Sequence, residues 1–390
     1  MPVLALGTLL SLSVWFSGAA VGSQLRSEWG LSALQVSLLT VAVQLGFATG
    51  ALALTATGVA DGVDARLLLA GGAGLAAVVN LGLLVADGPA FAVLTRFVTG
   101  MGLGAVYPTA TKQVTTWSRE RRGQLLAWMI AAMTTGSALP YLVAGLGAPG
   151  WRQVVVGTSA LAASGAAVLA LGGRPGPFPH PRGARVVGAE LRAALSNRPV
   201  VLAIAAYSGH MWELYAMWGT LPVFLAGAAG SRGSAQVSLA VFAVVATGAL
   251  GCLAGGAIGG RLGHLRAARL ALVCSAPAAL AAGLLHQAPA WALLPVCLWW
   301  GFWVIADSAQ LSALLVDRAD PRLVGAAAAT QLAVGFVTTA VALLVVPQVA
   351  RVAGWGWAYG LLAVGALAGV LALQSLGRPA ATPSGGPAGE

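Results

Sequence analysis

The sequence predicts an all-α membrane protein of twelve transmembrane helices, arranged in two sets of six. Of the 390 residues, 58% are hydrophobic and only 8% are charged, and the mean hydropathy is +0.85. Soluble domains carry about 25% charged residues, so water is not the main solvent of this chain. A membrane-spanning helix needs about 20 mostly apolar residues, and the chain is long enough for twelve with short connections.

Apolar segments separated by polar loops place the helices in order. The first six are expected at 4–22, 33–57, 66–86, 90–113, 123–146 and 152–172. The second six are expected at 199–227, 236–259, 267–286, 289–316, 323–348 and 354–376. The first run has no basic residue before it, unlike a secretory signal, so it is interpreted as a retained span.

These segments divide the chain into four parts. They are an N-terminal six-helix bundle (1–172), a cytoplasmic linker (173–198), a C-terminal six-helix bundle (199–377) and a tail (378–390). The linker is rich in Pro, Gly and Arg. The tail is low in complexity, and we expect it to be disordered.

The basic residues predict the orientation. Sixteen of the 21 Lys and Arg residues lie on the side of the linker and both termini, four lie on the opposite side, and Arg96 lies within a span. Basic residues accumulate on the cytoplasmic side, so both termini are expected there. Because they are spread over loops rather than gathered on one domain, they do not indicate a nucleic-acid surface.

The two halves resemble one another. Asp61 corresponds to Gly260, and Gly100 corresponds to Gly301, at offsets of 199 and 201 residues. The further pairs are Gly123 with Gly325 and Trp151 with Trp355, at offsets of 202 and 204. Nearly constant offsets favour two six-helix repeats related by an axis along the membrane normal.

Two short motifs follow the expected spans. The loop after the second helix reads V-A-D-G-V-D-A-R, with Asp61 and Arg66 at its third and last positions, and the equivalent later loop carries Arg261 and Arg266. An acid that ends one helix and bases that begin the next can hold one conformation of a gate. The fourth helix contains R-F-V-T-G-M-G from Arg96.

These motifs resemble the L-a-D-r-x-G-r-k and R-x-x-q-G-x-g signatures of the major facilitator superfamily, over nearly the whole chain. The chain is also similar to the bacterial branch that includes cyanate- and nitrate/nitrite-type permeases. The resemblance implies the major facilitator fold, a bacterial cytoplasmic membrane, a monomer and a central cavity lined by helices 1, 4, 7 and 10.

Ionisable side chains inside a bilayer are costly and are functional candidates. Here they are Arg96, His210, Glu213 and Asp307. His210 and Glu213 are three residues apart on one helix and share a face. We hypothesise that Glu213 is the proton site and His210 its partner, the alternative being a structural hydrogen-bonded pair. Arg96 and Asp307 are candidates for substrate contact, structural pairing or a gate bond.

Uncharged polar and aromatic side chains complete the expected pathway. They are Tyr207, Gln310, Gln44, Gln331, Trp15 and Tyr107. The alternative for any one of the aromatic residues is simple packing. Cys252, Cys274 and Cys297 have no metal-ligand spacing, so they are interpreted as buried thiols, and neither a metal nor a cofactor is expected.

The resemblance and the intramembrane charges together favour a carrier rather than an enzyme. We expect secondary active transport of a small solute, coupled to protons, with a slight preference for a polar or anionic solute. Proton-driven efflux of amphipathic cations is the second candidate. The sequence has no HExxH, GxSxG or GxxxxGK[ST] motif of an enzyme or an ATP-driven pump. A channel or a sensor remains open.

Overall fold

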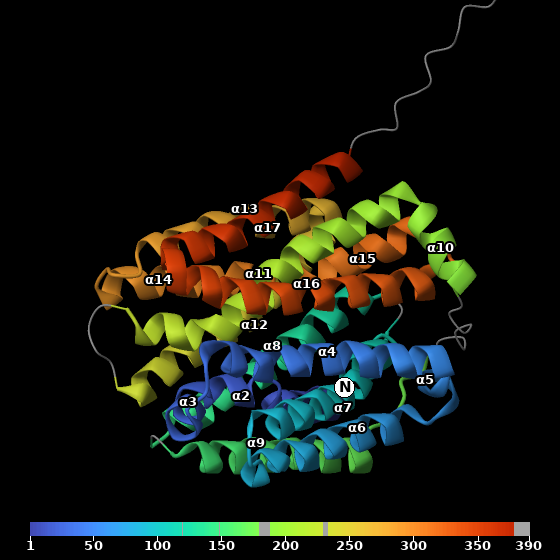
Figure 1. Ribbon diagram of the computed structural model, residues 1–390. Helices are drawn as coiled ribbons and strands as arrows, with labels where there is room; N and C mark the ends of the chain where they lie inside the picture. Colours follow the sequence, from blue (N-terminus) through green and yellow to red (C-terminus); the bar gives the residue numbers. More distant parts are fainter. Residues whose placement is uncertain (119, 148, 179–187, 229–232, 378–390) are drawn as a thin grey trace, which may run out of the picture.

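Helices make up all the regular structure in the described part of the chain (Figure 1). The computed structural model describes residues 1–118, 120–147, 149–178, 188–228 and 233–377. The expected tail and much of the linker lie outside these residues. The helices form two layers, an early one drawn blue to green and a late one drawn yellow-green to red.

The early layer contains the helices that precede the linker. They are α1 (Pro2–Ser11), η1 (Leu12–Val14), α2 (Ser17–Ala20), α3 (Gly22–Trp29), α4 (Ala33–Thr57), α5 (Val59–Gly62), α6 (Ala65–Asn80), η2 (Leu81–Val85), α7 (Pro89–Val114), α8 (Arg122–Gly145) and α9 (Trp151–Gly172). Helix α4 starts at a capping box, in which Ser32 and Gln35 satisfy each other's backbone N–H groups.

The late layer begins with a short helix at the end of the linker. Its helices are α10 (Gly188–Ser196), α11 (Arg198–Ala226), α12 (Ser234–Leu262), α13 (His264–Leu284), α14 (Ala290–Trp303), α15 (Ser308–Arg318), α16 (Val324–Ala353) and α17 (Trp355–Leu376). Within the described residues, ten segments are long and apolar enough to cross a membrane, with α14 and α15 counted as one. The chain is therefore a multi-pass membrane protein.

Two of the expected helices are interrupted. The first, expected to be continuous over 4–22, is divided into α1, η1, α2 and α3. The tenth, expected over 289–316, is divided at residues 304–307, which form turns between α14 and α15. Both interruptions lie in apolar sequence, so hydropathy does not report them. The expectation of continuous helices at these places was wrong.

Glycines allow two helix pairs to approach closely, and the contacts repeat along the chain. A Cβ added at Gly50 of α4 would lie 2.5 Å from the carbonyl oxygen of Met101 in α7. Gly251 of α12 has the same relation to Phe302 of α14, and both partners are displaced by 201 residues. A Cβ at Gly100 would likewise meet the Val43 carbonyl, and one at Gly301 would meet that of Val244. The same offset of 201 residues therefore relates helix–helix contacts in the two halves and not only single residues.

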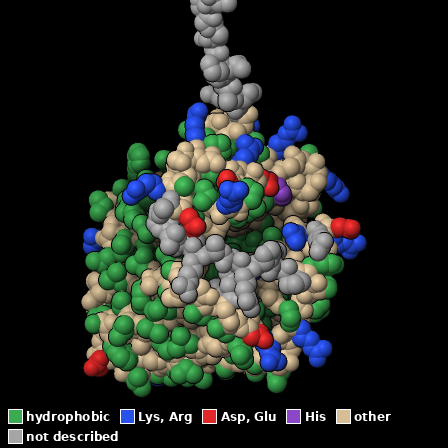
Figure 2. All heavy atoms as spheres, turned by 90° about the vertical axis from the view of Figure 1, so that its right-hand side faces the viewer, with side chains coloured by type: hydrophobic (Ala, Val, Ile, Leu, Met, Phe, Trp, Pro, Cys, Tyr) green, Lys and Arg blue, Asp and Glu red, His purple; other side chains and the backbone are tan. Residues whose placement is uncertain are grey.

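The two layers contact each other mainly through α4 with α16 and α8 with α12. The two layers face each other across the centre of the molecule between these two helix pairs. The end at which α5 and α10 lie, on the right in Figure 1, faces the viewer in Figure 2. Blue Lys and Arg side chains surround this end, and the sides of the molecule are largely green and apolar (Figure 2).

Candidate functional site

A narrow chamber with a cavity volume of about 20 Å³ lies between the two layers. Its described lining comes from both and contains no Asp, Glu, Lys, Arg or His. The lining residues are Leu12, Trp15, Tyr107, Ile130, Met133, Thr134, Ser137, Tyr207, Met211, Leu214, Tyr215, Trp218, Ile305, Ser308, Leu332 and Phe336. The chamber is therefore aromatic and aliphatic, with a few hydroxyl groups.

Aromatic rings from the two layers pack against each other at this chamber. Trp15 of the early layer stacks on Tyr215 of the late layer, with ring centroids 5.8 Å apart and planes inclined by 3°. Phe47 of α4 and Phe336 of α16 lie 4.5 Å apart in the same cluster. The indole N–H groups of Trp15 and Trp218 have no acceptor among the described residues. Both residues belong to the lining of the chamber.

Arg96 lies behind the chamber wall and fixes the interruption of the first helix. Its side chain is fully buried and donates to the carbonyls of Val14 at 2.8 Å and Trp15 at 2.7 Å. It also donates to the Ser17 hydroxyl at 3.0 Å and to the Asn80 amide oxygen. The two carbonyls accept these bonds where the helix is interrupted. Arg96 is thus a positioning residue for Trp15 and is not part of the chamber lining.

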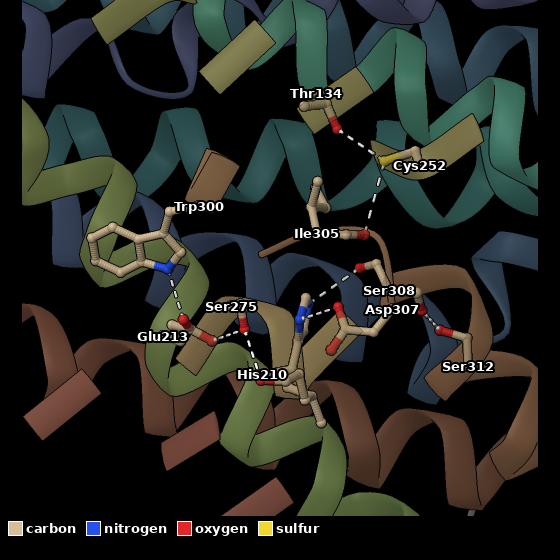
Figure 3. Close-up of polar contacts among 11 residues, drawn as sticks. Thr134, His210, Glu213, Cys252, Ser275, Trp300, Ile305, Asp307, Ser308 and Ser312 are labelled. Carbon is tan, nitrogen blue, oxygen red and sulfur yellow. Dashed lines mark hydrogen bonds and ion pairs between the residues drawn. The ribbon is translucent and has the colours of Figure 1, made fainter. Parts of the chain in front are cut away.

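His210 of α11 faces the interruption between α14 and α15. Its Nδ1 lies 2.8 Å from Oδ1 of Asp307, and its Nε2 lies 3.2 Å from Oγ of Ser308 (Figure 3). The His210 and Asp307 side chains are each 1% exposed. Ser308 belongs to the chamber lining. The imidazole therefore connects a carboxylate to a hydroxyl group of the chamber.

Glu213 contacts a different set of partners. One carboxylate oxygen accepts from Nε1 of Trp300 at 2.7 Å, and the other accepts from Oγ of Ser275 at 2.9 Å (Figure 3). Glu213 is fully buried, and its partners belong to α14 and α13. The ion-pair partner of His210 is thus Asp307 rather than Glu213.

The other expected pathway residues divide into two groups. Tyr207, Tyr107 and Trp15 line the chamber. Gln44 and Gln331 are buried outside the lining, and both amide atoms of Gln44 and Nε2 of Gln331 have no partner among the described residues.

Gln310 of α15 holds helices together near the end at which α10 lies. Its amide oxygen lies 2.7 Å from Nδ1 of His264, and its amide nitrogen donates to the Gly255 carbonyl at 3.1 Å. These bonds join α15 to α12 and α13, away from the chamber lining.

The expected gate residues lie at the ends of α5, α6, α12 and α13. Arg66, Arg261 and Arg266 are exposed. The backbone N–H of Arg66 donates to the side chain of Asp64, which caps α6, at 2.8 Å. The side chain of Asp61 lies outside the described residues, so the expected gate contact stays a prediction.

Several residues of the site were missed in the sequence. Tyr215 and Phe336 complete the aromatic cluster, Ser275 binds Glu213, and Asn80 binds Arg96. Tyr215 lies two residues after Glu213, so proximity to an intramembrane acid was a usable signal. Asn80, a polar residue inside an apolar helix, was another. Phe336 and Ser275 had no such signal, because aromatic and small hydroxyl side chains are common in these helices.

Comparisons with known proteins identify the family. The family model of the Major Facilitator Superfamily matches residues 3–336. The match covers most of the early layer and most of the late one. No curated protein matches the chain. Among the described residues, no group of three His, Cys, Asp or Glu side chains is placed to hold a metal ion.

Proposed function

The chain belongs to the major facilitator superfamily, and we propose that it is a proton-coupled carrier of amphipathic organic solutes with an apolar or aromatic body. Members of this family are secondary transporters rather than enzymes, which agrees with the apolar helices and with a chamber between the two layers. We place the carrier in a bacterial cytoplasmic membrane, with both termini on the cytoplasmic side, where the positive-inside rule puts its basic end.

We further propose twelve spans in two six-helix repeats. Ten of the spans are the apolar segments described above, and the interrupted first helix and α11, which has 29 residues, would be the other two. The repeated glycine contacts support this proposal, since Gly50 with Met101 and Gly251 with Phe302 share one offset. Alternating access would then rock one repeat against the other around the chamber.

The residues that line the chamber indicate the chemical class of the solute. No basic side chain among the described residues lines it, and the two terminal nitrogens of Arg96 are bonded to protein oxygens. A small anion would find no counter-charge there. Aromatic faces and free indole N–H groups suit a flat or bulky organic body, neutral or cationic. This favours the amphipathic solute over the polar or anionic one.

Proton coupling is supported by the position of the ionisable cluster. His210, Asp307 and Glu213 lie in the same layer, and Ser308 joins His210 to the chamber. Buried ionisable residues of this kind mark proton pathways in transporters.

Binding of tetraphenylphosphonium to the purified protein in detergent tests the proposed solute class. Loss of one aromatic face costs about 1–2 kcal/mol, so Tyr215→Ala should weaken binding by roughly 5- to 30-fold. Trp299→Ala is the matched control, because Trp299 is 54% exposed and is not in the chamber lining. Unchanged binding in Tyr215→Ala, or stabilisation by organic anions that depends on Arg96, would count against the proposal.

The same probe tests transport. In sealed proteoliposomes, a pH gradient should drive saturable movement of tetraphenylphosphonium, and dissipating the gradient should abolish it. A non-saturable current would instead indicate a channel. Saturable movement that does not depend on the pH gradient would refute proton coupling.

A further inference from the structure

Three ionisable side chains share the interior of the late layer. His210, Glu213 and Asp307 are each at most 1% exposed. A buried charge is stable only when it is paired. When both carboxyl groups are ionised, two like charges share this interior, and a proton on one of them removes their repulsion. The cluster as a whole therefore has a place for one exchangeable proton.

The groups that face Asp307 leave His210 as its only cationic partner among the described residues. On α11 it contacts His210 and lies within electrostatic range of Tyr207 and Glu213, and on α12 it lies within electrostatic range of Cys252. On α13, His264 is bonded to Gln310 instead. Arg96 belongs to the early layer and bonds α6 and the first helix.

The two carboxylates differ in whether their oxygen atoms accept hydrogen bonds. Both oxygens of Glu213 accept hydrogen bonds, one from Trp300 and one from Ser275, so a proton on either would displace a donor. Oδ1 of Asp307 lies 2.8 Å from Nδ1 of His210, but neither oxygen of Asp307 accepts a hydrogen bond from the described residues. Asp307 is therefore the carboxylate with room for the proton.

A path from the chamber leads to this carboxylate. Oγ of Ser308, in the chamber lining, lies 3.2 Å from Nε2 of His210, and Nδ1 of His210 lies 2.8 Å from Oδ1 of Asp307. The three groups follow one another in Figure 3. Glu213 has no hydrogen bond to any of them and is bonded instead to Ser275 and Trp300.

From this geometry we propose that Asp307, rather than Glu213, gains the coupled proton, by a relay through Ser308 and His210. The proposal rests on the proposed function, because a coupled proton presupposes a carrier. The Ser308 hydroxyl receives a proton from a hydronium ion in the chamber and passes its own to Nε2 of a neutral His210 imidazole that carries its proton on Nδ1. The imidazole releases the Nδ1 proton to Asp307. One proton has then moved from water to Asp307, and the imidazole is neutral in its other tautomer.

The relay acts where the helix is interrupted. Asp307 is the last residue of the turn at 304–307, and Ser308 is the first of α15. Protonation of Asp307 removes the carboxylate charge that attracts the imidazole of α11 to this turn. The turn also carries Ile305 and precedes Ser308, both of which line the chamber. The protonation state is in this way linked to the shape of the solute site.

Infrared difference spectra of the purified protein between about pH 9 and pH 5 test the relay without any solute. A buried carboxyl group that gains a proton produces a carboxylic acid C=O band. The wild-type protein is labelled with ¹³C in the side-chain carboxyl of either aspartate or glutamate. We expect the aspartate label to shift the band, Asp307→Asn to abolish it, and Glu213→Gln to leave it.

The wild-type labels decide the residue type even if a variant fails to fold. A band that shifts with the glutamate label and persists in Asp307→Asn would overturn the proposal and assign the proton to Glu213. The absence of any buried carboxyl band would overturn it as well. Failed binding of tetraphenylphosphonium would refute the solute class while leaving this titration intact, so the two failures are distinguishable.

Ser308→Ala tests the path rather than the site. It retains Asp307 and His210 and removes the hydroxyl group that faces the chamber. After a rapid drop in pH, the band should reach its full height at least several-fold more slowly than in the wild type. Ser312→Ala is the matched control one turn later on α15, where the exposed hydroxyl bonds only the Ser308 carbonyl among the described residues. Equal rates in wild type and Ser308→Ala would exclude the hydroxyl from the path.

Discussion

Gly251 of α12 makes the close approach to α14 possible, and Gly251→Ala tests how tightly that contact is packed. A Cβ at this position would clash with the Phe302 carbonyl, a backbone atom that cannot rotate away. Overpacking costs about 1–3 kcal/mol, and a rigid neighbour places the cost near 3. Replacing a helical glycine returns at most about 1 kcal/mol. The net loss of unfolding free energy is therefore about 2 kcal/mol.

Gly260→Ala is the matched control, because Gly260 belongs to the same helix and an added Cβ there meets no atom within 4 Å. Its unfolding free energy should equal that of the wild type or exceed it by at most about 1 kcal/mol. The assay is the midpoint of unfolding in sodium dodecyl sulfate, followed by circular dichroism. If Gly251→Ala and Gly260→Ala unfolded at the same midpoint, the argument from close helix contact would be refuted.

Two further predictions concern Arg96 and Glu28. Arg96→Lys leaves one compact donor group where a guanidinium bridged two carbonyls. The unfolding free energy of this variant should therefore fall by about 1–3 kcal/mol. An unchanged midpoint in the detergent titration would show that the interruption at Trp15 is stable without the guanidinium. Hydrogen bonds from Trp151 and then Arg152 hold the pKa of Glu28 below its ordinary value. This contact therefore stabilises the fold above the ordinary glutamate pKa and is lost as pH falls through the lowered one. Relative to Glu28→Gln, the wild type should lose stability below about pH 4, and parallel pH profiles would contradict this.

The membrane-spanning segments could be predicted well from the sequence, because the bilayer requires long apolar runs. The segment expected at 33–57 is α4 (Ala33–Thr57), and the one expected at 199–227 is α11 (Arg198–Ala226). The interruptions near Trp15 and Asp307 could not be predicted. Neither place has a proline or a glycine pair that would end a helix, and the polar residues near them do not by themselves distinguish a break from a continuous span.

The ionisable residues of the site could also be found from the sequence, but their partners could not. His210 and Glu213 are three residues apart, which places them about 60° apart around α11. That angle is small enough to suggest a pair, yet large enough for each side chain to meet a different helix. Asp307 contacts one of them, and Trp300 and Ser275 contact the other.

Arg96 illustrates the same limit. The sequence identified a cation within a span, for which an anionic solute or a nearby acid was the expected partner. The structure gives it the carbonyls of Val14 and Trp15, which lie where the first helix is interrupted. Backbone acceptors are invisible in a residue pattern, because every residue carries one and nearly all are used within the helix.

The sequence by itself determined that this protein lies in a membrane, which segments are apolar enough to span it, and which few charges are buried with them. Composition decides these properties, because transfer from water to the bilayer depends on each segment alone. Only the tertiary structure decided that Trp15 meets Tyr215 and that His210 meets Asp307. Those contacts depend on how each helix is rotated and interrupted relative to its neighbours, and packing between distant segments sets both.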